Sequence, residues 1–313
     1  MSDLDPDIRI FVETVAADAA RHPDSHAIPY AEARRNLEHV RRRWVAGGPD
    51  MARSVDLEVP TRHGAMNARL HAPHGDGALP LLVYLHGGGW TFFSIETHDR
   101  VMREYADRAG VAVLGLDYAL SPEAKFPVAL HQTIDAVRWV QQDAARLGVD
   151  PARISVGGDS AGANLALATA LALRDEGDVG LVQGLVLNYG AYDAHCSDAA
   201  HRFGGPGYML GSEEMAVFWR NYTWDPRDLE NPLVCPARAD VTGLPPVFMA
   251  IPQCDLLTEQ NELMADRFRA AGVAVDARVY QGATHSFLEA VSIAAVSARA
   301  LDDTAGWLRR NNG

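Results

Sequence analysis

One serine lies between glycines at the junction of a strand-like run and a helix-like run, in the stretch "GDSAG" from residue 158. The run "RISV" before it is rich in β-branched residues, and the alanine- and leucine-rich run after it has the composition of a buried helix. The two glycines allow a turn that is too tight for residues with a Cβ atom. A strand that turns directly into a helix favours a sheet covered by helices, so this stretch predicts an α/β fold.

The remainder of the chain supports the same fold class. Short continuous apolar runs, "LPLLVYL" from residue 79 and "VAVLGL" from residue 111, are typical of strands buried on both faces of a parallel sheet. Helix-like and strand-like segments then alternate from residue 128 onward. Alternating polar and apolar residues on both sides of Gly64 predict a β-hairpin that adds an antiparallel edge. We expect a mostly parallel central sheet with helices on both faces.

Two segments lie outside this alternation. Residues 1–48 have the apolar spacing of two helices, broken by "HPDSHAIP". Residues 192–243 contain no strand signal but include several prolines and a helix-like run near 212–222, and such an insertion is too long for a simple connector. We expect a catalytic domain made of residues 49–191 and 244–313, and a helical cap made of the insertion together with the N-terminal helices.

Charge and composition exclude several classes of partner. The chain has 313 residues and a net charge of −13, which disfavours binding to nucleic acid. The short basic run at residues 41–43 is interpreted as the solvated face of a helix. No stretch of about 18 apolar residues predicts a membrane span. The N-terminus lacks the apolar core of a signal peptide, and Cys196, Cys235 and Cys254 have no metal-ligand spacing, so we expect a reduced cytoplasmic protein with no metal.

Ser160 has the setting of an activated nucleophile. A Gly-x-Ser-x-Gly motif between a strand and a helix lifts the serine hydroxyl above the sheet, where it can reach a substrate. The backbone N–H of Ala161, at the start of the helix, favours negative charge at the same place. The alternative is a glycine-rich turn whose serine has no chemical role.

A second glycine-rich stretch, "HGGGW" from residue 86, directly follows a strand-like run. Acyl transfer places negative charge on a carbonyl oxygen, and backbone N–H groups must already face that oxygen. We expect Gly88 and Gly89 to donate such hydrogen bonds together with Ala161. We expect His86 to brace the loop rather than to act as a base. A phosphate-binding loop is the alternative, but the stretch lacks the Lys-Ser/Thr pair of a P-loop and the spacing of a dinucleotide fold.

A serine nucleophile needs a base and a carboxylate that orients the base. Ligands bind at the carboxyl ends of parallel strands, and Asp255 and His285 each follow a strand-like run directly. We therefore predict Asp255 as the acid and His285 as the base. The alternatives are a helix N-cap for Asp255 and a plain surface histidine for His285. His98, just before a helix, is interpreted as a helix-cap or lid contact. Four further histidines are expected to be solvated, namely His71, His74, His195 and His201.

These motifs together resemble a known family. The stretches "HGGGW", "DYALSPEAKFP", "GDSAGANLA", "CDLL" and "THSF" are similar to those of the bacterial hormone-sensitive-lipase-like esterases, and within that family most similar to bacterial acetyl esterases. The resemblance runs from about residue 55 to the C-terminus. It implies an α/β-hydrolase fold with a helical cap, no cofactor, and hydrolysis of short-chain acyl esters. It also makes a homodimer plausible.

By motif position, the resemblance assigns Ser160 as nucleophile, Asp255 as acid and His285 as base, with an oxyanion hole formed by Gly88, Gly89 and Ala161. The segment after the acid departs from the family pattern, which commonly has Asp-Pro-Leu followed by another Asp where this chain has "DLLTE".

The expected substrate is a small ester with an acetyl to about hexanoyl group, cleaved through an acyl-enzyme. Two alternatives remain open. The same residues could hydrolyse an amide, a formamide or a lactone. The chain could instead be a non-catalytic small-molecule receptor on a hydrolase scaffold, although such receptors depend on a damaged triad.

Overall fold

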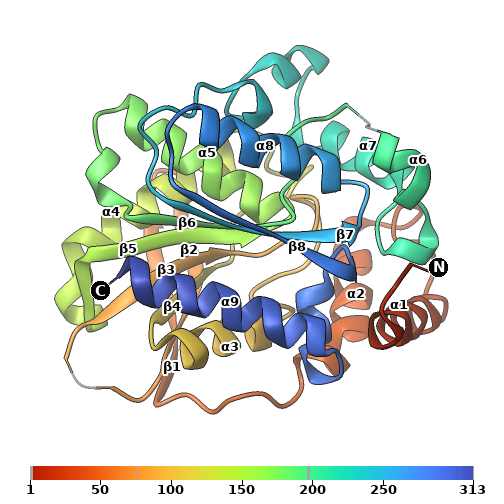
Figure 1. Ribbon diagram of the computed structural model, residues 1–313, viewed down its shortest axis with the longest axis horizontal. Helices are drawn as coiled ribbons and strands as arrows, with labels where there is room; N and C mark the ends of the chain where they lie inside the picture. The colour runs from red at the N-terminus through yellow and green to blue at the C-terminus, as the bar shows by residue number, and fades with distance from the viewer. Residues whose placement is uncertain (1–2, 76, 196–197, 313) are drawn as a thin grey trace.

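The structure is a computed structural model that describes residues 3–75, 77–195 and 198–312. Within these ranges, the strands form one sheet in the order β1-β2-β4-β3-β5-β6-β7-β8. β1 pairs antiparallel with β2, and β2 with β4, whereas all other neighbours are parallel. The predicted α/β class is therefore confirmed, with the antiparallel hairpin at one edge of the sheet (Figure 1).

Two inner strands of the sheet are buried along their whole length. All five residues of β4 and of β6 are buried, as the continuous apolar runs of the sequence predict. The strands are β1 (Arg53–Thr61), β2 (Gly64–Ala72), β3 (Leu79–Leu85), β4 (Ala112–Leu116), β5 (Val149–Asp159), β6 (Gly184–Asn188), β7 (Val247–Cys254) and β8 (Val275–Thr284).

Helices cover both faces of the sheet (Figure 1). One face carries α4 (Val128–Leu147), α5 (Ala161–Asp175) and α8 (Thr258–Ala270), and the other carries α3 (Asp99–Ala109) and α9 (Ala295–Asn311). Each face has its own apolar core, the first including Leu85 and Leu167, the second including Phe248 and Leu301. None of the helices in the described ranges is long and apolar enough to cross a membrane.

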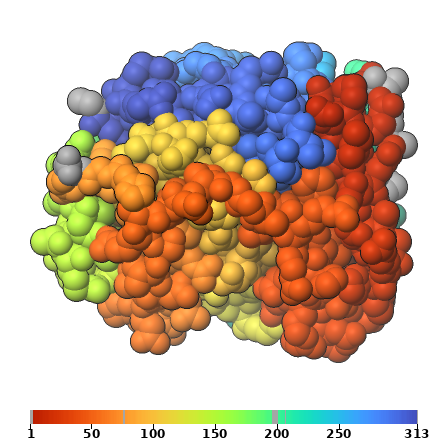
Figure 2. Space-filling view, turned by 90° about the horizontal axis from the view of Figure 1, so that it is seen from below, coloured from red at the N-terminus to blue at the C-terminus, as the bar shows by residue number. Residues whose placement is uncertain are grey.

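The remaining helices lie near the carboxyl ends of β7 and β8 (Figure 1). They are α1 (Pro6–Ala19), α2 (Tyr30–Val45), α6 (Asp198–Phe203) and α7 (Ser212–Tyr222), accompanied by short 3-10 turns. Asp5 caps α1 by accepting a hydrogen bond from Asp7 N at 2.9 Å, and Pro6 occupies its first turn. Phe11 on α1 meets Trp44 on α2 edge to face at 4.7 Å between ring centroids. Figure 2 shows the N-terminal segment lying directly against the C-terminal part of the chain.

Two predictions about side-chain burial were wrong. Arg41, expected on a solvated face, is 6% exposed because α2 packs that side against the 3-10 turn at Phe287–Ser292. His71, expected to be solvated, is 1% exposed because it is held between Ser54 and Asp99. Cys196, one of the three cysteines of the sequence, lies outside the described residues.

The packing of α5 predicts a large cost for truncating Leu167, whose side chain is fully buried beneath the sheet. Leu167→Ala leaves a cavity and should lower the free energy of unfolding by about 2–5 kcal/mol. Leu263→Ala on α8 is the matched control, because Leu263 is 63% exposed and its loss should change stability by less than about 0.5 kcal/mol. Urea unfolding of both variants measures the difference, and equal midpoints would contradict the assigned core.

Candidate active site

Ser160 sits on a strained turn between β5 and α5. Its backbone has φ +54° and ψ −117°, a conformation that L-residues rarely adopt. A Cβ atom on Gly158 or on Gly162 would overlap the carbonyl oxygen of Leu85 at the end of β3. The glycines are therefore needed for close approach of two backbones, and this approach holds the serine at the carboxyl edge of the sheet.

The three residues predicted as nucleophile, acid and base lie together. His285 Nε2 is 3.0 Å from Ser160 Oγ, and His285 Nδ1 is 2.7 Å from Asp255 Oδ2. Asp255 is fully buried, and its other oxygen accepts a hydrogen bond from Leu257 N at 3.0 Å. A continuous path of hydrogen bonds thus connects a buried carboxylate to the serine hydroxyl, the arrangement needed for proton transfer from serine to imidazole.

The charge of Asp255 changes the proton affinity of His285. Burial disfavours the imidazolium ion, but the neighbouring carboxylate outweighs burial and raises the pKa of His285 above its ordinary value. The edge of the His285 ring is packed against Tyr189 at 5.1 Å between ring centroids. The ring is thereby held in the orientation in which its two nitrogens face the acid and the serine.

The glycine loop after β3 lies at the same cavity as Ser160. Gly88 and Gly89 have φ +113° and +59°, and both line the cavity together with Ser160 and His285. Among the described residues, no acceptor takes a hydrogen bond from the backbone N–H of Gly88, Gly89 or Ala161. Unpaired N–H groups near the serine hydroxyl are what an oxyanion hole requires.

A buried network fixes this loop to the nucleophile turn. Asp159, the residue before Ser160, accepts hydrogen bonds from Tyr84 Oη at 2.8 Å and from Gly87 N at 3.0 Å. His98 Nε2 lies 3.4 Å from the second Asp159 oxygen. Burial disfavours both charges, but each partner stabilises the other, so the pKa of Asp159 is lowered and that of His98 is raised. His98 precedes α3 without capping it and instead pairs with this aspartate.

His86 occupies the base of the glycine loop, as expected. Its Nδ1 lies 2.7 Å from the Gly87 carbonyl oxygen, and its ring stacks on Tyr118 at 4.4 Å. Burial and the nearby His98 lower the pKa of His86 to about 3. A histidine that stays neutral and is hydrogen-bonded to its own loop has a bracing role, not that of the base.

The cavity above Ser160 has a volume of about 260 Å³. Its walls come from three parts of the chain, with aliphatic residues of α1 and α2, aromatic residues of the glycine loop, and residues of the insertion. They include Val12, Val15, Leu37, Arg41, Phe92, Phe93, Met209, Leu210, Glu214 and Phe218. The charged members, Arg41 and Glu214, carry no signal in the sequence because nothing local distinguishes them from surface residues.

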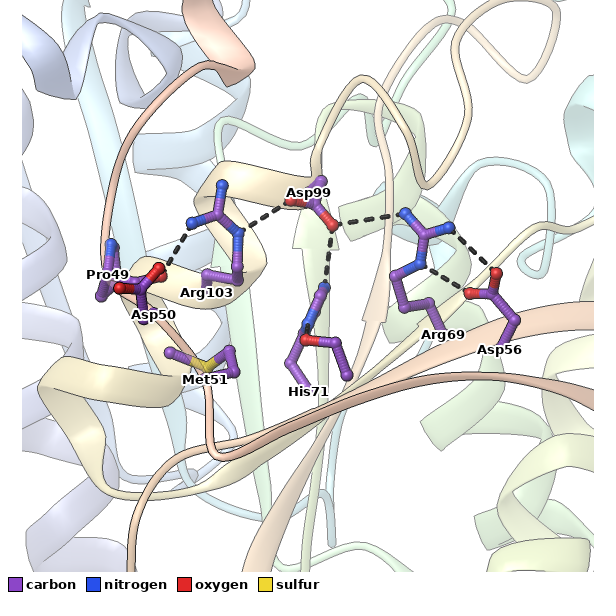
Figure 3. A pocket seen from close by; sticks show the side chains of 9 residues that line it. Pro49, Asp50, Met51, Asp56, Arg69, His71, Asp99 and Arg103 are labelled. Atoms are coloured by element: carbon purple, nitrogen blue, oxygen red, sulfur yellow. Dashed lines mark hydrogen bonds and ion pairs between the residues drawn. The ribbon is translucent and has the colours of Figure 1, made fainter.

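A larger pocket, of about 640 Å³, contains none of the predicted site residues. It lies between the hairpin, α3 and the segment after α2, and in Figure 3 His71, Asp99 and Arg69 point toward one another. Asp99 is held by His71 at 3.0 Å and by Arg103 at 2.8 Å, which ties the hairpin to α3. Its polar groups bind mainly one another, so we assign this pocket a structural role.

A search of the described residues finds no cluster of three or more His, Cys, Asp or Glu side chains that could hold a metal ion. Cys254, next to Asp255, is buried, and burial raises the pKa of its thiol to about 11. This cysteine is therefore a neutral thiol at ordinary pH and not a competing nucleophile.

Comparison with known proteins identifies relatives over nearly the whole chain. The alpha/beta hydrolase fold family matches residues 82–289. A hyperthermophilic esterase from the archaeon Pyrobaculum calidifontis is 34% identical, with a TM-score of 0.92 over 98% of each chain. A thermophilic carboxylesterase, EstE1, cloned from a metagenomic library, is 34% identical, with a TM-score of 0.89 over 93% of this chain and 100% of that chain. An ester hydrolase from the metagenome of Lake Arreo is 31% identical, with a TM-score of 0.92 over 98% of each chain.

The geometry of the glycine loop predicts the effect of Gly88→Ala. The new Cβ would overlap the carbonyl oxygen of Phe92 and displace the loop N–H groups, so turnover of p-nitrophenyl butyrate should fall by about 10²–10³. Gly64→Ala is the control, because Gly64 also has a positive φ of +101° but has nothing within 4 Å of the added atom. Steady-state kinetics are measured on both variants. An equal loss of activity in the two would contradict the assignment of the glycine loop to the oxyanion hole.

Proposed function

The chain belongs to the alpha/beta hydrolase fold family, and we propose that it is a serine carboxylesterase that cleaves short-chain acyl esters through an acyl-enzyme. The observation that carries this proposal is the hydrogen-bonded path from Asp255 through His285 to Ser160, which ends in a cavity shared with Gly88 and Gly89. The esterases among the similar solved structures support the same reaction.

In the proposed mechanism, Ser160 Oγ attacks the ester carbonyl carbon while His285 Nε2 takes the hydroxyl proton. The N–H groups of Gly88, Gly89 and Ala161 bind the resulting oxyanion. The intermediate collapses, and His285 gives its proton to the departing alcohol, which leaves the acyl group on Ser160. Water, deprotonated by His285, then attacks the acyl-enzyme and releases the acid.

We propose that residues 1–48 and 192–243 form a cap that limits the acyl group to about six carbons. Side chains from both segments line the cavity, and His26 Nε2 lies 3.7 Å from Glu214 Oε1, which links the two segments. A cavity of about 260 Å³ lies below the usual range for drug-sized ligands, which favours small acyl groups.

We also propose that the protein is located in the cytoplasm and forms a homodimer. Buried, free Cys235 and Cys254 are in keeping with a reducing compartment.

Hydrolysis of p-nitrophenyl esters from acetate to laurate, measured for the parent and for Ser160→Ala, tests the proposal. We expect the highest kcat/KM at acetate to hexanoate and loss of at least about 10³-fold in the variant, because the remaining groups cannot form an acyl-enzyme. Circular dichroism checks that the variant is folded. A maximum at laurate would refute the short-chain limit, and undiminished turnover by the variant would refute the nucleophile. A parent that is inactive on every ester would favour an amide, formamide or lactone hydrolase, or the receptor.

The pH profile tests His285 separately. The base must be neutral to accept a proton, and its raised pKa keeps it protonated to a higher pH than an ordinary histidine. The acid limb of kcat/KM should therefore have a midpoint above about 6.5. Asp255→Asn removes the carboxylate charge, so it should move this limb to lower pH and reduce kcat by about 10⁴. A flat profile between about pH 5 and pH 8 would contradict the assigned base.

A further inference from the structure

Arg41 is a buried cation at the wall of the cavity that contains Ser160. It comes from α2, and only 7% of its side chain is exposed, compared with 61% for Arg43 on the same helix. Its Nη1 lies 3.1 Å from Glu289 Oε2, and its guanidinium lies 4.8 Å from the centre of the Phe93 ring. These two contacts hold the guanidinium in place without a substrate, so it is preorganised.

Within the residues that the structure describes, the hydrogen-bonding capacity of Arg41 is unused. An arginine has five N–H donors, and burial without acceptors is costly. Nη1 and Glu289 Oε2 are close but do not form a hydrogen bond of good geometry. No side chain or carbonyl in the described ranges accepts a hydrogen bond from Nε or Nη2 of Arg41. Nη1 is itself fully buried, so Nε and Nη2 are the donors left for a ligand. Arg41 lines the cavity, which puts its side chain beside the space where the substrate is bound.

The surrounding charges indicate what kind of acceptor fits. Glu289, 5% exposed, already balances the charge of Arg41, and Glu214 lines the same cavity. A carboxylate on the substrate would be a second carboxylate against the single positive charge of Arg41, which is already paired with Glu289, and this is unfavourable at a buried position. An uncharged oxygen can accept a hydrogen bond from the guanidinium without adding charge. The geometry and the charges together favour an ether, ketone or second ester oxygen.

We propose that Arg41 is a specificity-determining residue that selects esters carrying a second, uncharged oxygen on the acyl or the alcohol arm. The oxygen accepts a hydrogen bond from the guanidinium while Ser160 attacks the ester carbonyl. This inference rests on the proposed function, because it places the ester in the cavity above Ser160.

Matched substrates test this role. Each pair consists of a plain ester and an isostere with one CH₂ replaced by an ether oxygen, such as p-nitrophenyl pentanoate against 3-methoxypropanoate and butyl acetate against 2-methoxyethyl acetate. The ether oxygen is moved along chains up to six atoms long on each arm, with at least one CH₂ between it and the carbonyl carbon on the acyl arm and at least two between it and the ester oxygen on the alcohol arm. The readout is the ratio of kcat/KM for the ether to that for the plain ester. Intrinsic reactivity cancels when this ratio is compared between proteins.

We expect the parent to prefer the ether at one or more positions, and Arg41→Met to lower that ratio by about tenfold or more, the usual worth of a hydrogen bond to a charged group. Arg43→Met, the same change on the exposed side of the same helix, should leave the ratio unchanged. Glu289→Gln retains the Arg41 donors and should retain the preference. If the Arg41→Met variant does not fold, the double variant that combines Arg41→Met with Glu289→Gln replaces it. This variant also removes the carboxylate of Glu289, which would otherwise be buried without a partner, and it allows the same comparison.

A ratio that Arg41→Met leaves unchanged at every position on both arms would overturn the proposal, and so would a parent with no ether preference. The measurements distinguish the role of Arg41 from the esterase function. A parent that hydrolyses plain esters with an unchanged ratio in the variant contradicts the role of Arg41 alone. A parent that hydrolyses no ester contradicts the proposed function itself.

Discussion

The close contact between the end of β3 and the turn after β5 is the constraint on which the site depends. The carbonyl oxygen of Leu85 lies where a Cβ atom on Gly158 or Gly162 would be, so the two backbones meet without side chains between them. The chain continues from Leu85 into the glycine loop, and Asp159 binds that loop at Gly87 N. One backbone contact thus places the nucleophile turn and the loop N–H groups side by side. Loops of ordinary composition could not approach so closely.

Buried carboxylates with basic partners surround this contact. Asp159 faces His98, Asp255 faces His285, and Glu289 faces Arg41. Only the second pair reaches the serine, while the first holds the glycine loop and the third stands at the cavity wall. Each pair is costly to bury and costlier to break, because removing one partner leaves an unpaired charge. Such pairs fix orientation, and here each one orients a different element of the same site.

The parts of this structure that sequence predicts are those with local signals. Gly158 and Gly162 mark the turn around Ser160, and the apolar runs mark the buried strands, so the fold class was predictable. Asp255 and His285 are predictable because a parallel sheet brings the carboxyl ends of its strands to one edge. In the structure these two residues lie at that edge, within hydrogen-bonding distance of each other. Arg41 and Glu289 had no such signal. They are far apart in sequence, and α2 has charged residues on the faces around Arg41, so burial of this one arginine depends on packing that only tertiary structure shows.

The cavity is assembled from both ends of the chain. Asp5 N donates to the carbonyl oxygen of Gly282 at 2.9 Å, and Arg41 reaches Glu289 across the same junction. Contacts of such long sequence separation require a large loop to close, and they form slowly. The enclosure of the cavity is therefore a long-range property of the fold, because its walls include residues as distant in sequence as Val12 and Ser286, whereas the turn around Ser160 is set by its immediate neighbours.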